Sequence, residues 1–177
     1  LEVIKVKNEF RNNGFEIDFY ESPNRSPILD LAFSQALKSP IVVCTDSQSE
    51  AEAIDEKLGG RGLRLDSKTS GEEWVKTFLE NPTDYIATTK PKYLIYTPSA
   101  ENGLDINIEG YFSDQFCLFF GVLATDSQTQ MIARIRDTGC KRHIWAPKKG
   151  MPVNPVSKSP FPAKVSAALE EYLLADG

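Results

Sequence analysis

The sequence predicts an α/β fold in which a parallel sheet is covered by helices on both faces. Three observations lead to this prediction. Short apolar runs recur along the chain at residues 41–44, 93–96 and 116–122. Helical patterns of about ten residues separate them, and turn residues mark the junctions. Such runs suit strands buried on both faces, and their alternation with helices is typical of parallel sheets.

The composition is that of an ordinary globular domain. The 177 residues are 41% hydrophobic and 25% charged, with a net charge of −5. No apolar run approaches the roughly 18 residues of a membrane span, and no signal-peptide pattern opens the chain. We therefore expect a cytoplasmic protein without membrane contact. Because the first residue is leucine, we also expect an excised piece of a larger protein.

The chain divides into three parts. Residues 1–27 carry two short apolar alternations and are expected to form a linker or edge strands. Residues 28–147 hold the alternating strands and helices, and form the main domain. Prolines recur from Pro147 to Pro162, which predicts a stiff connector in residues 148–177 that leads into a helix over 163–174.

The first half of the main domain begins with a helix from Pro27 to Leu37. After the strand at 41–44, Ser47 and Glu50 have the spacing of a capping box and predict a helix over 48–58. A short strand at 62–66 and a helix at 71–80 follow. Residues 81–84 are interpreted as a turn, and residues 85–87 as a brief extended piece.

The second half is centred on the strand at 116–122. Residues 107–113 are expected to form a polar loop at the ligand-binding edge of the sheet. A helix over 127–137 would carry Gln130, Arg134 and Arg136, and residues 141–145 are the expected last strand. Cys44 and Cys117 lie within apolar runs and are predicted to be small core residues. A structural role is predicted for His143.

Residues 97–106 follow a buried strand, and ligands of open α/β sheets bind at that edge. Ser99 can cap a short helical turn, and Gly103 allows close backbone approach. Asp105 is then left at a tight turn, with Arg134 and Arg136 expected near the same rim. An acid and two arginines that converge there could grip a nucleotide triphosphate.

These residues carry a family resemblance. Residues 97–106 read Thr-x-x-Ala-x-x-Gly-x-Asp-Ile, and residues 130–136 read Gln-x-x-Ala-Arg-x-Arg. Together they resemble motifs V and VI of superfamily 2 helicases, in the second RecA-like lobe, and the second motif is most similar to origin-binding and plasmid replication helicases. The turn at Thr45 and Ser47 resembles motif IV. Three positions depart from the common pattern: Asn102, Ala133 and Asp137 replace an arginine, a glycine and an arginine.

The resemblance implies a three-layer RecA-like fold and a role for each residue. Arg134 and Arg136 would be the arginine finger and its companion, and Gln130 would sense the γ-phosphate. Asp105 would bind the nucleotide's ribose, and Gly103 would permit its approach. Neutral donors to nucleic-acid phosphates would be Thr45, Ser47, Thr97 and Ser99.

The implied ligands are ATP with Mg²⁺ and single- or double-stranded nucleic acid, with DNA favoured and a role in DNA replication. No G-x-x-x-x-G-K-[ST] phosphate loop is present in the sequence, so the site would be shared with an upstream RecA-like lobe and this chain alone would be inactive. The alternative is a degenerate RecA-like module that binds a partner or nucleic acid without hydrolysis.

The charges leave a further alternative open. A net charge of −5 argues against strong free-standing binding to a nucleic-acid backbone. The stretch from Arg134 to Lys149 is nonetheless basic, with further cationic side chains at Arg136, Lys141, Arg142 and Lys148. It could be an ordinary solvated face or a rim that faces phosphates.

Overall fold

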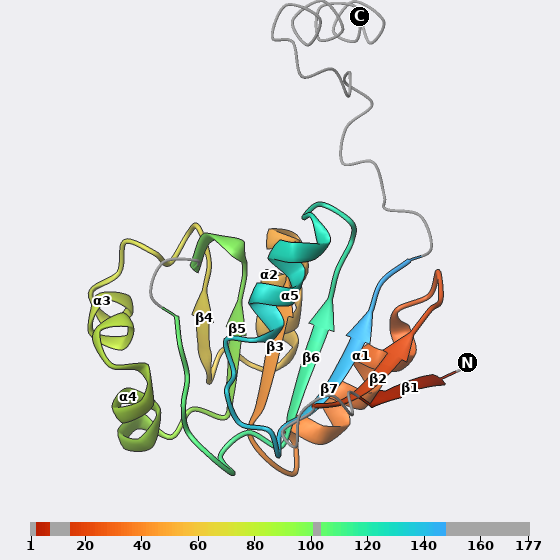
Figure 1. The fold of residues 1–177 in the computed structure, drawn as a ribbon. Coiled ribbons are helices and arrows are strands. Elements are labelled where there is room, and N and C mark those ends of the chain that lie inside the picture. Colours follow the sequence, from red (N-terminus) through yellow and green to blue (C-terminus); the bar gives the residue numbers. More distant parts are fainter. Residues whose placement is uncertain (1–2, 8–14, 101–103, 148–177) are drawn as a thin grey trace, which may run out of the picture.

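The computed structural model describes residues 3–7, 15–100 and 104–147. The strands are β1 (Val3–Lys7), β2 (Glu16–Tyr20), β3 (Ile41–Thr45), β4 (Leu63–Leu65), β5 (Tyr93–Tyr96), β6 (Asp114–Leu118) and β7 (Lys141–Trp145). They form one seven-stranded sheet in the order β1-β2-β7-β6-β3-β5-β4 (Figure 1). β1 pairs antiparallel with β2, and every other neighbouring pair is parallel.

Helices cover both faces of the sheet. They are α1 (Ser26–Ala36), α2 (Gln48–Lys57), α3 (Glu73–Glu80), α4 (Pro82–Thr89) and α5 (Thr125–Ile132), with a short 3₁₀ turn, η1 (Pro98–Ala100). Buried residues of α1 and α2 share one core cluster with alternate residues of β3, β5 and β6. Buried residues of α3, α4 and α5 share a second cluster with the other face of the same strands. The predicted three-layer α/β fold is therefore confirmed.

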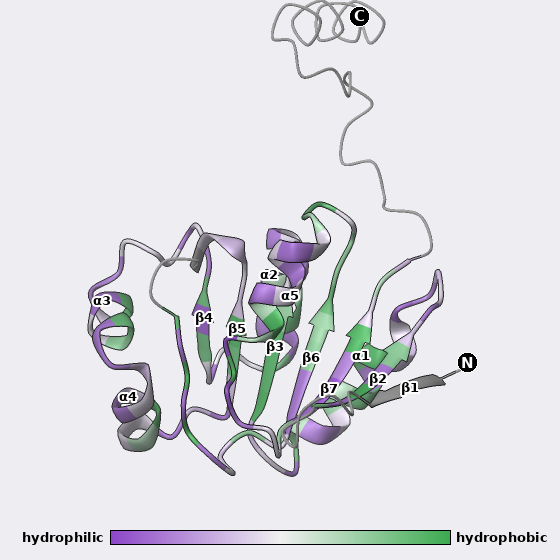
Figure 2. Ribbon diagram, in the orientation of Figure 1, coloured by the Kyte–Doolittle hydropathy of each residue, from purple (hydrophilic) through white to green (hydrophobic). Residues whose placement is uncertain are grey.

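The central strands are buried because their sequences are apolar on both faces. All residues of β3, β5 and β6 are buried. β3 is green in the hydropathy view, whereas β6 begins purple at Asp114 and Gln115 and is green toward its end (Figure 2). Cys44 and Cys117 are register partners on β3 and β6, and both are buried free thiols, as predicted. The capping prediction for α2 is also confirmed, because the Ser47 Oγ accepts the N–H of Glu50 at 3.3 Å.

One element of the first half was predicted wrongly. Residues 82–89 form the helix α4, where the sequence suggested a turn and an extended piece. The Asn81 side chain caps this helix by accepting the N–H of Asp84 at 3.1 Å, and Pro82 occupies the first helical turn. Asparagine followed by proline is a helix start as well as a turn signal. The buried side chain of Ile86, packed with Phe78 of α3, favours the helix.

The loop after residue 106 also lies elsewhere than predicted. It leads away from the ligand-binding edge, because the Ser113 N–H donates to the Pro40 carbonyl at 3.0 Å. Pro40 immediately precedes β3, so this contact lies at the edge where the strands begin. Gly110 has a φ of 68°, and its N–H donates to the Asp137 carboxylate at 2.8 Å. The loop is thus a fixed crossing to β6.

The N-terminal strands extend the same sheet. β2 pairs in parallel with β7, from Ile17 opposite Arg142 to Tyr20 opposite Trp145, and β1 forms the edge. The division of the chain at residues 27 and 147 stays a prediction. The predicted connector and the helix over 163–174 lie outside the described residues. None of the helices in the described part of the chain is long and apolar enough to cross a membrane.

A buried polar cluster joins β2, β6 and β7. His143 Nε2 lies 3.0 Å from the Asp114 carboxylate, and its Nδ1 lies 3.2 Å from the Tyr20 hydroxyl. The Asp18 carboxylate faces the same ring at 3.7 Å and also binds the Lys141 ammonium at 2.9 Å. These side chains pair with one another within the core, and only the Asp18 Oδ1 atom of this cluster is buried without a hydrogen-bond partner.

Asp114 is expected to make stability depend on pH. Burial tends to raise the pKa of this carboxyl, but hydrogen bonds, led by the one with His143, hold it below its ordinary value. Its contribution is therefore present above the unfolded pKa of about 3.9 and is lost as the pH falls through the lower folded pKa. We expect Asp114→Asn to lower the free energy of unfolding by about 1.5–3 kcal/mol at neutral pH.

Urea unfolding of both proteins at several pH values checks this prediction. The difference between wild type and Asp114→Asn should shrink as the pH falls below about 4. A constant difference across that range would contradict the assigned cause. Asp30→Asn, on the exposed side of α1, serves as a control in which a surface carboxylate is neutralised.

Candidate functional site

Two segments far apart in the sequence pair along their backbones. Ile106 and Ile135 form an isolated parallel bridge. The Ile106 N–H donates to the Arg134 carbonyl at 2.9 Å, and the Arg136 N–H donates to the Ile106 carbonyl at 2.9 Å. In Figure 1, the segment after the grey gap runs beside the segment that follows α5, in front of the sheet. The bridge thus brings the residues around Asp105 to those around Arg136.

Asp105 and Arg136 form an ion pair at this bridge. The Arg136 Nε lies 2.7 Å from Asp105 Oδ1, and the second nitrogen donates to Oδ2 at 3.4 Å. The hydrogen bond and charge of Asp105 raise the pKa of the Arg136 guanidinium. Both side chains remain more than half exposed, at 60% for Asp105 and 58% for Arg136. A ligand can therefore reach the pair, although solvent weakens their mutual attraction.

Arg134 lies in the turn after α5, and Gln130 lies on α5 itself. Arg134 is half-buried, and its Nη1 donates to the Leu104 carbonyl at 3.4 Å. Gln130 is exposed on α5. The predicted helix over 127–137 is wrong at both ends, because α5 runs from Thr125 to Ile132. Gly103 lies outside the described residues.

Helix α5 ends before the two arginines, because the burial of Ile135 and its backbone pairing with Ile106 stabilise a non-helical conformation there. Ile135 is fully buried in the core cluster through its bridge to Ile106. Tyr96, at the end of β5, fixes the last turn of α5 by donating its hydroxyl to the Met131 carbonyl at 2.6 Å. That carbonyl belongs to the last helical turn and also accepts the N–H of Arg134 at 3.2 Å. Residues 133 and 134 form a turn, after which Ile135 and Arg136 pair with Ile106.

The buried Arg142 holds the next loop in place. Its guanidinium donates to the carbonyls of Ile135 and Asp137, each at 2.8 Å, and to the carbonyl of Cys140. Burial lowers the pKa of this guanidinium from its ordinary value. Lys141 is likewise engaged with Asp18. Up to residue 147, where the described part of the chain ends, the basic stretch forms no single rim, because one of its cations is in the core and another belongs to the β2 cluster.

A second group of polar residues follows the carboxyl ends of β3 and β5. Thr45 is fully buried, and its Oγ1 accepts the Ser47 N–H at 3.2 Å. Thr97 is 4% exposed, and its hydroxyl lies 2.8 Å from that of Ser99. Thr45 and Thr97 therefore cannot offer a surface to a ligand as predicted, since the adjoining turns cover them. Ser47 and Ser99 remain accessible.

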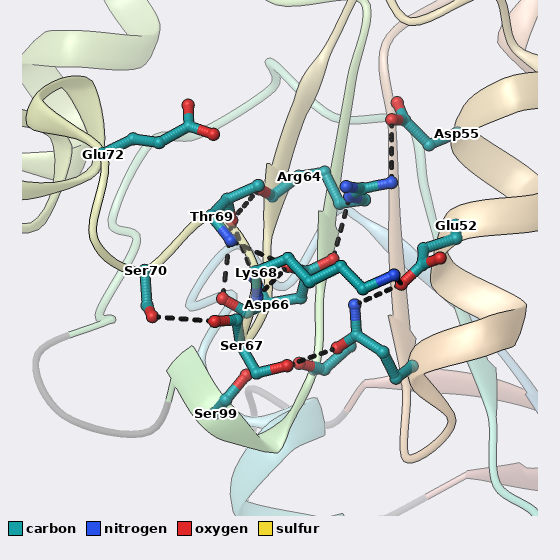
Figure 3. A network of polar contacts seen from close by, with 12 residues as sticks. Glu52, Asp55, Arg64, Asp66, Ser67, Lys68, Thr69, Ser70, Glu72 and Ser99 are labelled. Carbon is teal, nitrogen blue, oxygen red and sulfur yellow. Dashed lines mark hydrogen bonds and ion pairs between the residues drawn. The ribbon is translucent and has the colours of Figure 1, made fainter.

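The loop after β4 brings further donors to the same edge. Asp66 accepts the N–H groups of Lys68 and Thr69 at 2.8 and 3.0 Å and thereby shapes a tight turn. This turn presents Ser67, whose hydroxyl donates to the Gln48 side chain at 3.2 Å (Figure 3). No motif in the sequence pointed to this loop. An aspartate followed by small hydroxyl residues directly after a strand was the sequence feature that could have indicated it.

Lys68 contributes a positive charge at this edge of the sheet. Its side chain is 63% exposed, and its ammonium lies 2.7 Å from Glu52 of α2. With Ser47, Gln48 and Phe120 it lines a cavity of about 550 Å³. The opposite wall is fixed by Asp46, whose carboxylate accepts the N–H groups of Phe120 and Val122 at 2.7 and 3.0 Å. The cavity therefore combines hydroxyl donors, the paired charges of Lys68 and Glu52, and the apolar side chains of Phe120 and Val122.

Solved structures were compared with this fold. The Mycobacterium smegmatis helicase Lhr, bound to ssDNA and AMP-PNP, matches with a TM-score of 0.51 and 14% identity over 76% of this chain. The Pyrococcus furiosus Hef helicase domain matches with a TM-score of 0.44 and 22% identity, also over 76%. The chain spans only 19% of the Lhr chain and 27% of the Hef chain. No protein-family profile and no curated protein matches it.

These findings define the class of the domain. The parallel sheet with helices on both faces is the α/β fold of the RecA-like domains of helicases, as the Lhr structure shows. At these levels of identity the likeness extends to the fold alone. What the two groups of side chains do is therefore inferred from their own geometry.

Proposed function

We propose that this chain is the second RecA-like lobe of a nucleic-acid-dependent ATPase of the superfamily 2 helicase type. The single observation that carries the proposal is the bridge between Ile106 and Ile135. Two sequence motifs that resemble motifs V and VI meet at this bridge, with Asp105 and Arg136 in contact at 2.7 Å. Chance matches of two short patterns would have no reason to pair in space.

The arginines are proposed to act on the phosphates of ATP. Phosphoryl transfer is accelerated mainly by positioning and by stabilising negative charge on the transferred group. Arg134 is proposed as the arginine finger, with Arg136 as its companion. Asp105 would bind the ribose, and Gly103 would permit its approach. Gln130, exposed one helical turn before Arg134, would sense the γ-phosphate.

ATP and Mg²⁺ would be shared with an upstream lobe. The exposed guanidinium of Arg136 and the half-buried one of Arg134 fit an anion, and the Asp105 carboxylate fits a ribose hydroxyl. Mg²⁺ would screen the phosphate charge when bound. Its ligands are assigned to the upstream lobe, because no group of three or more potential metal-binding side chains is found in the described part of the chain. This chain then supplies the arginines and orients the nucleotide.

Nucleic acid is proposed to run along the carboxyl edge of β3, β4 and β5, with DNA favoured over RNA. The contacts would come from the accessible hydroxyls of Ser47, Ser67 and Ser99 and from the ammonium of Lys68. Such contacts to phosphates position a strand without reading its sequence. Thr45 and Thr97 would support the serines beside them through the hydrogen bonds already described.

Lys68 should therefore contribute one ionic contact to this strand. In a chain that includes the upstream lobe, Lys68→Ala is expected to weaken binding of single-stranded DNA and to lower the slope of log K against log salt by about 0.7. Fluorescence anisotropy across a salt series measures both quantities. Lys76→Ala, an exposed lysine on α3, is the matched control and should leave the slope unchanged. An unaltered slope for Lys68→Ala would remove this residue from the proposed track.

The proposal as a whole is tested by ATP hydrolysis. The 177-residue chain alone should show no turnover above a blank. The chain extended through its natural upstream lobe should hydrolyse ATP faster when single-stranded DNA is added. No turnover by a folded, extended protein with an intact phosphate loop would refute the ATPase.

A degenerate binding module is the second candidate. One observation favours it: Arg136 is already paired with Asp105, the residue proposed to bind ribose. In such a module the pair would be a permanent surface contact, and the chain would bind a partner or nucleic acid without hydrolysis. Stimulated hydrolysis by the extended chain would exclude this candidate.

A further inference from the structure

A second cavity lies at the edge of the sheet opposite the proposed track. It has a volume of about 440 Å³ and is found where α1 and α2 end and where β5 begins. Its apolar floor consists of Phe33, Ala36, Leu58 and Tyr93. Leu37 stands at its rim with 89% of its surface exposed, more than any other large hydrophobic residue in the described part of the chain. Leu37 thus extends the apolar surface of the cavity to its exposed rim.

Three cations surround this apolar floor. Lys57, Arg61 and Lys92 all line the cavity and are exposed. The Lys57 ammonium lies 4.3 Å from the centre of the Phe33 ring, which holds it over the floor. Among the described residues, none of the three takes part in an ion pair. The whole chain carries a net charge of −5, so these three cations form a local positive patch on a protein that is negative overall.

The helix ends decide which kind of anion suits the site. α1 and α2 both direct their C-terminal ends here, and Leu37 and Leu58 are their C-caps. A helix C-terminus carries partial negative charge, which disfavours a dense phosphate group and favours N–H donors. The turns that follow already pair the carbonyls of Gln35, Asp55 and Glu56 with backbone N–H groups. Lys57 complements the dipole of α2, but Arg61 and Lys92 lie outside the helices. The combination suits isolated carboxylates next to apolar groups and amide N–H groups.

We propose that this surface, formed by Leu37, the cavity and the cations Lys57, Arg61 and Lys92, binds an acidic, amphipathic segment of a partner protein. A leucine or aromatic side chain of the partner fills the cavity, adjacent aspartate or glutamate side chains pair with the cations, and its N–H groups face the helix ends. The volume falls in the range of ligand pockets and accommodates one such anchor. The inference is independent of the proposed ATPase, because the two sites lie at opposite edges of the sheet.

Selection from a phage-displayed library of random short peptides tests this inference with the 177-residue chain as bait. Enriched peptides should combine aspartate or glutamate with leucine, phenylalanine or tryptophan. In anisotropy measurements, Leu37→Ser and Arg61→Glu should each raise the Kd of the labelled peptides by about tenfold or more. Both positions are exposed, so the variants should keep the melting temperature of the wild type.

A control variant and a charge-reversed peptide complete the test. Lys76→Glu, a charge reversal on α3, should change the Kd by no more than about twofold. A selected peptide with its acids changed to lysine should bind Arg61→Glu better than it binds the wild type. The proposal is overturned if selection enriches no acidic apolar peptides, or if the peptides bind both site variants as tightly as the wild type. It is also overturned if anionic vesicles or single-stranded DNA, and not peptides, lose binding in Arg61→Glu.

Discussion

Replacing Arg134 by alanine is expected to lower the nucleic-acid-stimulated kcat by about 10³-fold or more in a chain that includes the upstream lobe. The guanidinium would stabilise charge that develops on the transferred phosphoryl group, and the shortened side chain cannot reach it. Arg134 lies in the turn after α5, and its carbonyl accepts the N–H of Ile106 at 2.9 Å, so its backbone is fixed before a ligand binds. Steady-state ATPase assays with saturating single-stranded DNA measure the loss.

Two matched variants separate the roles of the neighbouring residues. Arg136→Ala is expected to cause a smaller loss of kcat, because this side chain is proposed as the companion and is shared with Asp105. Asp105→Asn should mainly raise the KM for ATP, since its proposed contact is with the ribose. Arg61→Ala, an exposed arginine at the opposite edge, should change neither constant. An unchanged rate in Arg134→Ala would remove the central assignment.

The largest expected effect on stability is at Arg142. Arg142→Met is expected to lower the free energy of unfolding by about 3–5 kcal/mol, because it leaves the carbonyls of Ile135, Asp137 and Cys140 buried without their donor. Methionine keeps much of the side-chain volume, so the loss reports mainly on these hydrogen bonds. Urea unfolding followed by far-UV circular dichroism measures it.

The same substitution should loosen the segment that carries the arginines. The Ile135 carbonyl is one acceptor of Arg142, and Ile135 forms the bridge to Ile106. Hydrogen exchange of the Ile106 and Arg136 amides, which donate across that bridge, should therefore quicken in Arg142→Met. With Arg61→Ala as the control, both stability and exchange should stay as in the wild type. Normal exchange at both amides in Arg142→Met would show that the clamp does not support the site.

Much of the fold follows from local sequence patterns. The apolar runs of β3, β5 and β6 predict buried strands because only a strand covered on both faces has no polar side. Ser47 predicts the start of α2 because its side chain caps the helix at short range. The Asn81–Pro82 pair was misinterpreted because its local signal is shared by turns and helices. Packing of Ile86 on Phe78 settles the choice, and that contact depends on the tertiary structure.

The candidate site was only partly predictable. The types and spacing of Asp105, Arg134 and Arg136 could be found in the sequence and compared with a family pattern. Their pairing could not, since the helix was expected to continue to residue 137, whereas burial of Ile135 against Ile106 ends it at Ile132. The exposure of Lys68 and the burial of Thr45 could not be predicted from the sequence either, because both depend on how neighbouring turns cover this edge of the sheet.

The sequence by itself therefore determined the class of fold and the residue types available for chemistry. These properties depend on periodicity and capping, which act over a few residues. Only the tertiary structure decided which of those residues are buried, paired or exposed. In the folded structure Arg142 is buried in the core, and Asp105 pairs with Arg136. Lys57, Arg61 and Lys92 line one cavity. The physical reason is that burial and charge pairing are set by contacts between elements distant in the chain, which no local pattern encodes.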